Sequence, residues 1–188
     1  MKRILTVMLA ALCTLAAAQE PGGTFTDQRD EKTYRTVKIG ERVWMAENLD
    51  FDTVGSWCYN NTESNCKRSG RLYDWNTAMA ACPAGWRLPS RAEWGDLVKA
   101  VGDSAVGKAL KSKTLWNGTD EFGFTALPGG HRFKTGRFYS LGEEGLWWSS
   151  TATGGRNAWY RNLRTDSENL LENHIRRVEG LAVRCVKN

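Results

Sequence analysis

The sequence predicts an α+β domain that is exported and stabilised by disulfide bonds. Two segments with helix-capping signals lie in the first half of the chain, and short β-rich runs separated by glycines fill the second half. Such segregation of helices and strands is typical of α+β architecture. Four cysteines follow an N-terminal apolar segment. The length of the chain predicts one domain, large enough to bury a core.

The first 18 residues have the pattern of a Sec-type signal peptide. Lys2 and Arg3 give a cationic start, and residues 4–18 form an apolar run that ends in three alanines suited to cleavage. The run is too short for a transmembrane helix, which needs about 20 apolar residues, and we expect no membrane span elsewhere. We therefore expect cleavage before Gln19 and a secreted protein that is extracellular or at the cell surface.

The mature chain is expected to begin with a polar leader at residues 19–33, followed by one folded domain at residues 34–188. Within this domain, β-rich residues alternate with polar ones over residues 34–39, and residues 42–46 resume a β-rich run after a turn at Gly40. This pattern predicts a pair of strands at the start of the domain.

Two helices carry their own start signals. Asp74 can cap a helix over residues 75–81. Ser90 and Glu93 form a capping box for a second helix, which Gly102 can end. Apolar residues at helical spacing line one face of the second helix, and a short helical turn is expected after it: Trp94, Leu97, Val98 and Val101, then Val106, Ala109 and Leu110.

From residue 122 onward, short β-rich runs are broken by glycine-containing turns. Because successive side chains of a strand point to opposite faces, we expect one ring of the pair Trp147-Trp148 to face the core and the other to face outward. These runs predict short antiparallel strands: Phe124–Leu127, His131–Phe133, Arg137–Tyr139, Leu146–Ser149, Ala158–Leu163 and Leu181–Val186.

Four cysteines remain after removal of the signal peptide, and three pairings of them are possible. Cys58 and Cys66 flank a short polar loop, and their local pairing leaves Cys82 to pair with Cys185. A zinc site is the alternative, but the spacing has no C-x-x-C element and the chain has only two histidines. Exported domains commonly use disulfides. We therefore expect the disulfides Cys58–Cys66 and Cys82–Cys185, and no metal.

Charge and motif content argue against several classes of protein. The formal net charge is +5, or +3 without Lys2 and Arg3, and basic residues are mixed with acidic ones, which does not favour a nucleic-acid binder. No recognisable catalytic pair of carboxylates, serine triad or phosphate-binding glycine loop is present. We therefore expect a monomer that is not an enzyme and has no cofactor.

Aromatic residues and arginines are concentrated in the late strands, and the chain has nine tryptophans. Tryptophan and tyrosine stack on the apolar faces of sugars and anchor protein interfaces. Core packing is the alternative role for each of these rings. The candidate ligand-binding residues are Trp159, Tyr160, Arg161, Tyr139, Arg137, His131, Arg132 and Arg156, with Asp166, Glu168 and Asn169 as neighbouring polar groups.

A set of ordered motifs covers nearly the whole mature chain. The motifs are Val37-Lys38-Ile39-Gly40, Trp44-Met45-Ala46-Glu47-Asn48-Leu49, Gly70-Arg71-Leu72-Tyr73-Asp74-Trp75, Cys82-Pro83-Ala84-Gly85-Trp86-Arg87-Leu88-Pro89, Glu93-Trp94, Phe122-Gly123-Phe124-Thr125-Ala126-Leu127-Pro128-Gly129-Gly130, Trp147-Trp148-Ser149-Ser150 and Val183-Arg184-Cys185. With these motifs, the sequence resembles the Fibrobacter succinogenes major paralogous domain, a family of secreted bacterial proteins.

The resemblance implies a C-type lectin-like fold, which formylglycine-generating enzymes also use, and implies no activity. In that fold a cysteine on a helix commonly pairs with one on the last strand, in agreement with the pair Cys82–Cys185. Sugar-binding C-type lectins hold calcium with side-chain oxygens, but Leu127-Pro128-Gly129 has none beside its proline. Formylglycine chemistry needs a reactive cysteine pair, and two disulfides leave none free.

Three functions therefore compete. The expected function is a secreted, non-catalytic binding module that recognises an extracellular polysaccharide or surface protein without calcium. The first alternative is a structural or accessory cell-surface domain that has no free ligand. The second alternative is an oxidoreductase of the formylglycine-generating type.

Overall fold

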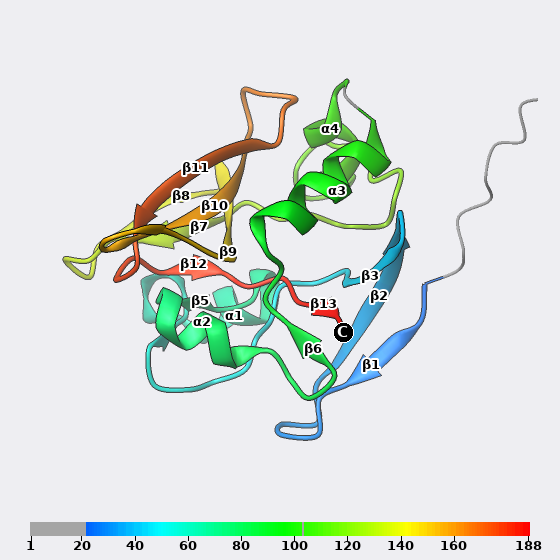
Figure 1. The fold of residues 1–188 in the computed structure, drawn as a ribbon. Coiled ribbons are helices and arrows are strands. Elements are labelled where there is room, and N and C mark those ends of the chain that lie inside the picture. Colours follow the sequence, from blue (N-terminus) through cyan, green and yellow to red (C-terminus); the bar gives the residue numbers. More distant parts are fainter. Residues whose placement is uncertain (1–21, 103) are drawn as a thin grey trace, which may run out of the picture.

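The structure is a computed structural model that describes residues 22–102 and 104–188, and it contains two β-sheets (Figure 1). The predicted signal peptide at residues 1–18 lies outside the described residues. The smaller sheet contains, in spatial order, β1 (Thr24–Thr26), β2 (Thr33–Ile39), β3 (Arg42–Met45), β13 (Val186–Lys187) and β6 (Trp86–Arg87).

The larger sheet carries most of the late strands. In spatial order it contains β11 (Leu171–Arg176), β10 (Asn157–Arg164), β9 (Glu144–Gly154), β12 (Leu181–Ala182), β5 (Leu72–Tyr73) and β4 (Ser56–Trp57). Two further strands join it at β9 as a hairpin, β7 (Gly129–Arg132) and β8 (Phe138–Leu141).

Short helices pack around the sheets. The helix α2 (Trp75–Ala81) and the helix α3 (Arg91–Val101) both contact β9. The other helices are a 3-10 turn and two short α-helices: η1 (Tyr59–Asn61), α1 (Glu63–Ser69) and α4 (Val106–Leu110).

The prediction of an α+β domain with a C-type lectin-like fold is wrong, because the molecule is mostly β. Strands β1 to β6 lie in the first half of the chain, so helices and strands are not segregated. Strands β7 and β12 pair with β9 in parallel, contrary to the antiparallel pairing expected. Strands β4, β5 and β6 have two residues each, too few to produce the alternation that reveals a strand in a sequence.

The helices with capping signals form where predicted. The Asp74 side chain accepts a hydrogen bond from the Thr77 N–H (2.9 Å) at the start of α2. Ser90 and Glu93 form the predicted capping box of α3, and Gly102, with a φ of 108°, ends this helix. Helix caps can be predicted from the sequence because the side-chain acceptor and the backbone N–H that it binds lie within a few residues along the chain.

Two further elements, α1 and β11, have no sequence signal, and two predicted strands differ. The helix α1 lies inside the polar cysteine loop. The strand β11 lies at the edge of the larger sheet and is mostly polar, with four of its six residues exposed. Residues 124–127 form only an isolated bridge, between Ala126 and Lys111. The predicted strand Leu181–Val186 is divided between β12 in the larger sheet and β13 in the smaller one.

Residues 22–33, the described part of the expected leader, add an edge strand to the smaller sheet. Strand β1 pairs antiparallel with β2, and the Phe25 ring packs on Trp86 with the ring centroids 5.3 Å apart. Asp27 is fully buried and accepts hydrogen bonds from the Arg29 side chain, the shortest of 2.6 Å. The pairing with β2 and the contact with Trp86 attach the segment to the rest of the smaller sheet, and the Asp27–Arg29 hydrogen bonds order the segment itself.

Both predicted disulfides are present. Cys58–Cys66 links the start of η1 to α1 across 8 residues. Cys82–Cys185 links the end of α2 to the residue before β13 across 103 residues. Because β13 lies between β3 and β6, the second disulfide fixes the C-terminal segment within the smaller sheet.

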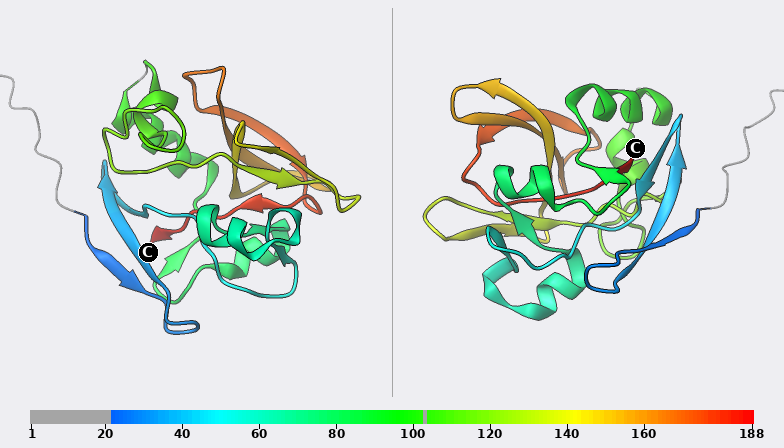
Figure 2. Two further views of the ribbon diagram at one scale, coloured as in Figure 1. Left: turned by 180° about the vertical axis from the view of Figure 1, so that it is seen from behind. Right: turned by 60° about the horizontal axis from the view of Figure 1, so that its bottom comes forward.

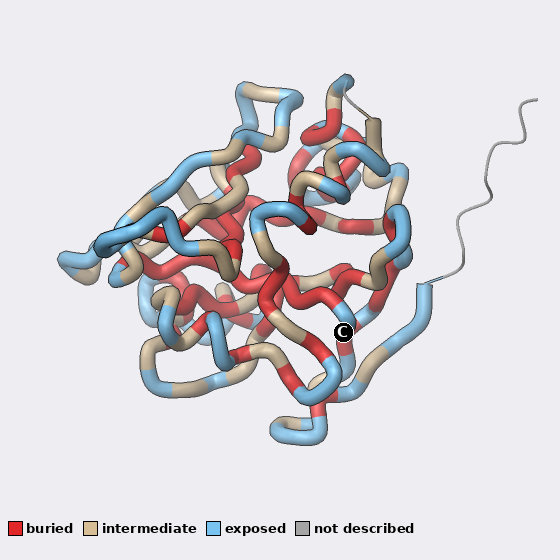
Figure 3. The backbone as a smooth tube through the Cα atoms, in the orientation of Figure 1, coloured by how far each residue is buried: buried red, intermediate tan, exposed pale blue. Residues whose placement is uncertain are grey.

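Both rings of the pair Trp147-Trp148 are fully buried, so the prediction that one faces outward is wrong. Trp147 packs in a cluster with residues of α3, and Trp148 packs in a cluster with residues of α2. Their indole N–H groups donate to Asn48 Oδ1 (2.8 Å) and to the Tyr73 carbonyl (2.7 Å). Both faces of β9 are covered, so alternation along this strand does not distinguish core positions from solvent-exposed ones. Figure 3 shows that buried residues gather at the centre of the molecule.

A fully buried arginine connects three distant segments. The Arg184 guanidinium donates hydrogen bonds to Asn48 Oδ1 (2.7 Å) and to the carbonyls of Met45 (3.3 Å) and Phe124 (2.5 Å). Burial lowers the pKa of Arg184 to about 9, so it remains charged at neutral pH. Among the described residues, only neutral acceptors contact this charge.

Glu93 gives the stability a dependence on pH. Its carboxylate, 8% exposed, accepts hydrogen bonds from Arg87 (2.6 Å) and from the Ser90 N–H (2.8 Å). Burial alone would raise the pKa of Glu93, but these hydrogen bonds outweigh burial and lower it to about 2. This pKa lies below the ordinary value of 4.5. The carboxylate therefore stabilises the fold above about pH 4.5 and loses this effect as the pH falls toward 2.

We expect Glu93→Gln to lower the free energy of unfolding at neutral pH by about 3 kcal/mol. The loss of stability of the parent protein between about pH 4.5 and 2 should be smaller in this variant. Urea unfolding across this pH range measures both effects, and Glu41→Gln, at an exposed position, is the control. An unchanged pH dependence in Glu93→Gln would contradict this role of the capping carboxylate.

Candidate binding surface

The candidate ligand-binding residues do not form one surface, because the strands distribute them over different faces. Along β10, Trp159 and Arg161 point to one side of the larger sheet and Tyr160 points to the other, since successive side chains alternate. On β7, His131 and Arg132 likewise point to opposite sides of the β7–β8 hairpin.

The Trp159 ring is covered by groups of the protein itself. The Arg91 guanidinium, from the first residue of α3, lies 3.8 Å from its centroid, and the His174 ring meets it edge-on at 5.5 Å. Glu172 on β11 binds both Arg91 (2.7 Å) and Arg161 (2.7 Å), and the hydrogen bond from Arg91 lowers the pKa of Glu172 against the effect of burial. These contacts engage one face of the half-buried Trp159 ring and pair the Arg161 side chain, which is 11% exposed.

The β7–β8 hairpin, which projects from the body of the molecule (Figure 2), carries an exposed candidate ring. Tyr139 is 42% exposed, whereas Trp159 and Tyr160 are half-buried. His131, its partner across the hairpin, stacks on it with the ring centroids 5.8 Å apart, and Phe133 meets it edge-on at 6.3 Å. We call His131, Phe133 and Tyr139 the hairpin aromatic surface.

Glu144 lies close to this surface and to Tyr160. Burial lowers the pKa of His131, and the Glu144 carboxylate partly offsets that effect. Burial raises the pKa of Tyr160, and the same carboxylate adds to the shift. His131 is therefore neutral at neutral pH, and its buried Nδ1 has no hydrogen-bond partner among the described residues. An exposed phenol beside an imidazole suits a ligand rich in hydroxyl groups.

The remaining candidates lie apart from this surface. The Arg132 guanidinium packs over the Trp57 ring, 4.0 Å from its centroid, on the other side of the hairpin. Arg137, just before β8, and Arg156, at the turn between β9 and β10, are exposed and form no ion pair with any described residue. The predicted polar neighbours lie in the loop between β10 and β11, where two of them are ion-paired: Asp166, Glu168 and Asn169.

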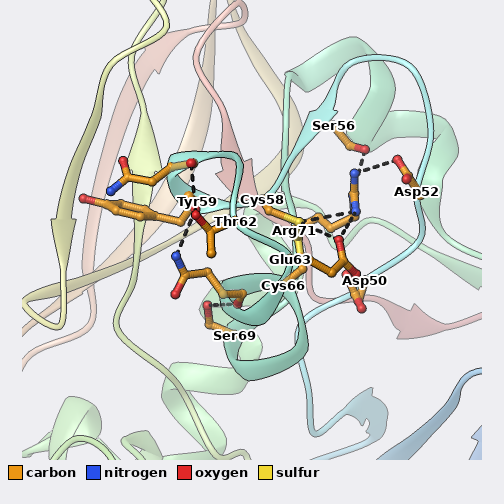
Figure 4. The surroundings of a disulfide bond; sticks show 12 residues. Asp50, Asp52, Ser56, Cys58, Tyr59, Thr62, Glu63, Cys66, Ser69 and Arg71 are labelled. Atoms are coloured by element: carbon orange, nitrogen blue, oxygen red, sulfur yellow. Dashed lines mark hydrogen bonds and ion pairs between the residues drawn. A yellow bond between two sulfur atoms is a disulfide. The ribbon is translucent and has the colours of Figure 1, made fainter.

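The disulfide beneath the hairpin is part of a group that resembles a metal site in composition only. Cys58, Cys66 and Glu63 place three potential ligand atoms within 4.8 Å of one another. Sulfurs joined in a disulfide are not thiolates, and thiolates are the form that binds metal. The Arg71 guanidinium lies 3.5 Å from Cys58 Sγ and 2.6 Å from the Asp52 carboxylate (Figure 4). Both contacts support a structural role for this group.

Two residues that support the hairpin aromatic surface were not among the candidates predicted from the sequence. Phe133 contacts Tyr139 directly, and Tyr59, beside the disulfide, packs on the Phe138 ring at 5.2 Å. Spacing could have revealed Phe133, since it lies two residues after His131 and residues two apart share a face of a strand. The contact of Tyr59 has no sequence signal, because it joins segments far apart in the chain.

These features define a disulfide-bonded, β-rich domain, and the family follows from its sequence. A family model described as the Fibrobacter succinogenes major domain matches residues 37–187. The chain belongs to this family. No curated protein and no solved structure matches the chain significantly. The two disulfides are consistent with an extracellular location, and no helix of the described residues is long and apolar enough to cross a membrane.

Proposed function

We propose that this domain is a secreted, non-catalytic module that binds an extracellular polysaccharide through the hairpin aromatic surface. One observation carries the proposal: the Tyr139 ring is exposed, yet His131 and Phe133 hold it in place. A ring that is already ordered loses little conformational entropy on binding, and its face can stack on the apolar face of a sugar. Exposed Arg137, two residues away, adds hydrogen-bond donors.

The distribution of apolar surface favours a polysaccharide over a large protein partner. A stable protein interface buries about 800 Å² on each partner, and its anchor residues cluster near the centre. A sugar ring needs only one aromatic platform with polar groups beside it. The exposed large hydrophobic residues of this domain come from six separate loops, strands and helices: Val54, Met79, Leu115, Tyr139, Leu171 and Val178.

The state of the cysteines supports a non-catalytic role. All four cysteines of the described residues are joined in disulfides. None of them is therefore a free thiolate for chemistry of the formylglycine-generating type. Two of the acidic residues also have structural roles. The Glu93 carboxylate takes part in a helix cap, and the Asp120 carboxylate accepts hydrogen bonds from Thr125.

Tyr139→Ala is expected to weaken polysaccharide binding about tenfold, because the stacking face is lost. The melting temperature should change little, because the ring is exposed. The mature domain is first screened against immobilised glycans and cell-wall polymers, with and without a chelator, and a retained polymer is then titrated. Tyr139→Phe keeps the ring and should bind nearly as tightly as the parent protein, and Leu171→Ala controls for the loss of an exposed apolar side chain elsewhere.

Several outcomes would contradict the proposal. If Tyr139→Ala binds the polymer as tightly as the parent protein, the hairpin aromatic surface is not part of the binding site. If this variant loses much of its stability, the Tyr139 ring has a structural role. No binding to any polymer would favour the structural domain without a free ligand. Binding that the chelator abolishes would reveal a calcium site, and turnover of a peptidyl cysteine would support an enzyme.

A further inference from the structure

A groove of 420 Å³ lies between the start of β2, the end of α1 and the loop that follows α4. This volume falls within the range of about 300–1,000 Å³ that is typical of small-molecule sites. An adjoining cavity of 180 Å³ shares residues with the groove and reaches Leu141, at the end of β8. The groove therefore approaches the base of the hairpin, but Tyr139 does not line it.

The groove carries two positive charges that have no partner. Lys67 and Arg68, in the last turn of α1, are exposed and form no ion pair with any described residue. The other two basic residues of the lining are paired with two carboxylates that also line the groove, so these four charges balance: Lys32 with Asp50 at 2.8 Å and Arg35 with Glu47 at 2.9 Å. An acidic ligand would therefore meet two cations that do not first have to break an ion pair.

A third positive charge lies behind the wall of the groove. Asn48 lines the groove, and its Oδ1 accepts hydrogen bonds from the buried Arg184 guanidinium. Arg184 forms no ion pair with a described carboxylate, but the negative charges of Glu47, which lines the groove, and Asp120 partly offset its field. The remaining field of this buried charge favours an anion in the groove.

We infer that the groove binds a carboxylated saccharide, such as a uronic acid unit of an extracellular polymer. The ligand carboxylate would bind Lys67 and Arg68, because charge-assisted hydrogen bonds to a carboxylate are strong. The exposed hydroxyl of Thr114 can hydrogen-bond to the sugar, and this favours a saccharide over other acids. The hydroxyls of three other lining residues are engaged within the protein: Ser69, Ser112 and Thr125. The inference stands independently of the proposed role of Tyr139.

Titration with an oligogalacturonate and with a neutral oligoglucoside of equal length tests the inference. The mature protein should bind the acidic oligomer about tenfold more tightly or better, and rising salt should reduce the difference. Lys67→Ala/Arg68→Ala should lose this preference. Lys38→Ala/Lys99→Ala removes the same charge at exposed positions outside the groove and should keep it. Tyr139→Ala should also keep it, which separates this site from the hairpin aromatic surface.

Equal affinity for the two oligomers would overturn the inference. So would a preference that survives in Lys67→Ala/Arg68→Ala. Tighter binding of a polyol phosphate polymer, or of polyglutamate, than of the oligogalacturonate would overturn the assignment of a carboxylated saccharide.

Discussion

Replacement of Arg184 with methionine is expected to lower the free energy of unfolding by about 3–5 kcal/mol. The guanidinium donates to Asn48 Oδ1 and to the carbonyls of Met45 and Phe124. It thereby joins the segment of residues 45–48 to the distant residue Phe124. Methionine has a similar length but cannot donate a hydrogen bond. Each buried acceptor that loses its donor costs about 1–3 kcal/mol. Denaturant unfolding followed by tryptophan fluorescence measures the loss.

Arg35→Met is the control for this variant. It removes an exposed ion pair with Glu47, for which the expected change is about 0–1 kcal/mol. Stability equal to that of the parent protein in Arg184→Met would contradict the role of Arg184 as a central link. If Arg184→Met does not fold, Arg184→Lys keeps the charge with fewer donors and should show a smaller loss.

Removal of the Cys82–Cys185 disulfide by the double change to alanine is expected to cost about 4.7 kcal/mol. The reason is that this disulfide closes a loop of 103 residues and so restricts the unfolded chain strongly. Unfolding in denaturant under non-reducing conditions measures the difference from the parent protein.

The matched control is Cys58→Ala/Cys66→Ala, which opens a loop of 8 residues. The same loop-entropy relation gives about 2.5 kcal/mol for this pair. A loss for the long-loop pair that does not exceed the loss for the short-loop pair would contradict the expected order. Free thiols in the folded parent protein would contradict the pairing itself.

Features with a local cause could be predicted from the sequence. The helices α2 and α3 form where expected because Asp74 and Ser90 cap N–H groups three residues away. The hairpin of β2 and β3 forms because Gly40, with a φ of 60°, adopts the left-handed backbone that the turn requires. The pairing of the cysteines followed from their even number and from one short intervening loop.

Features that arise from contacts between distant segments could not be predicted. Strand β12 has two residues, and only its pairing with β5 and β9 makes it a strand. Helices cover both faces of β9, so Trp147 and Trp148 are buried together. The candidate site has the same limit, since the sequence led us to place Trp159 at the centre of the surface and Tyr139 beside it, but does not reveal that Arg91 packs on the Trp159 ring. Only the fold separates the covered ring from the exposed one.

An aromatic NMR titration with a polysaccharide that the domain retains tests the central claim most directly. The claim is that the hairpin aromatic surface binds the polymer. The account predicts saturable shifts of the ring resonances of Tyr139 and Phe133, with no change at the buried ring of Trp148. Binding that leaves the resonances of Tyr139 and Phe133 unchanged would contradict it.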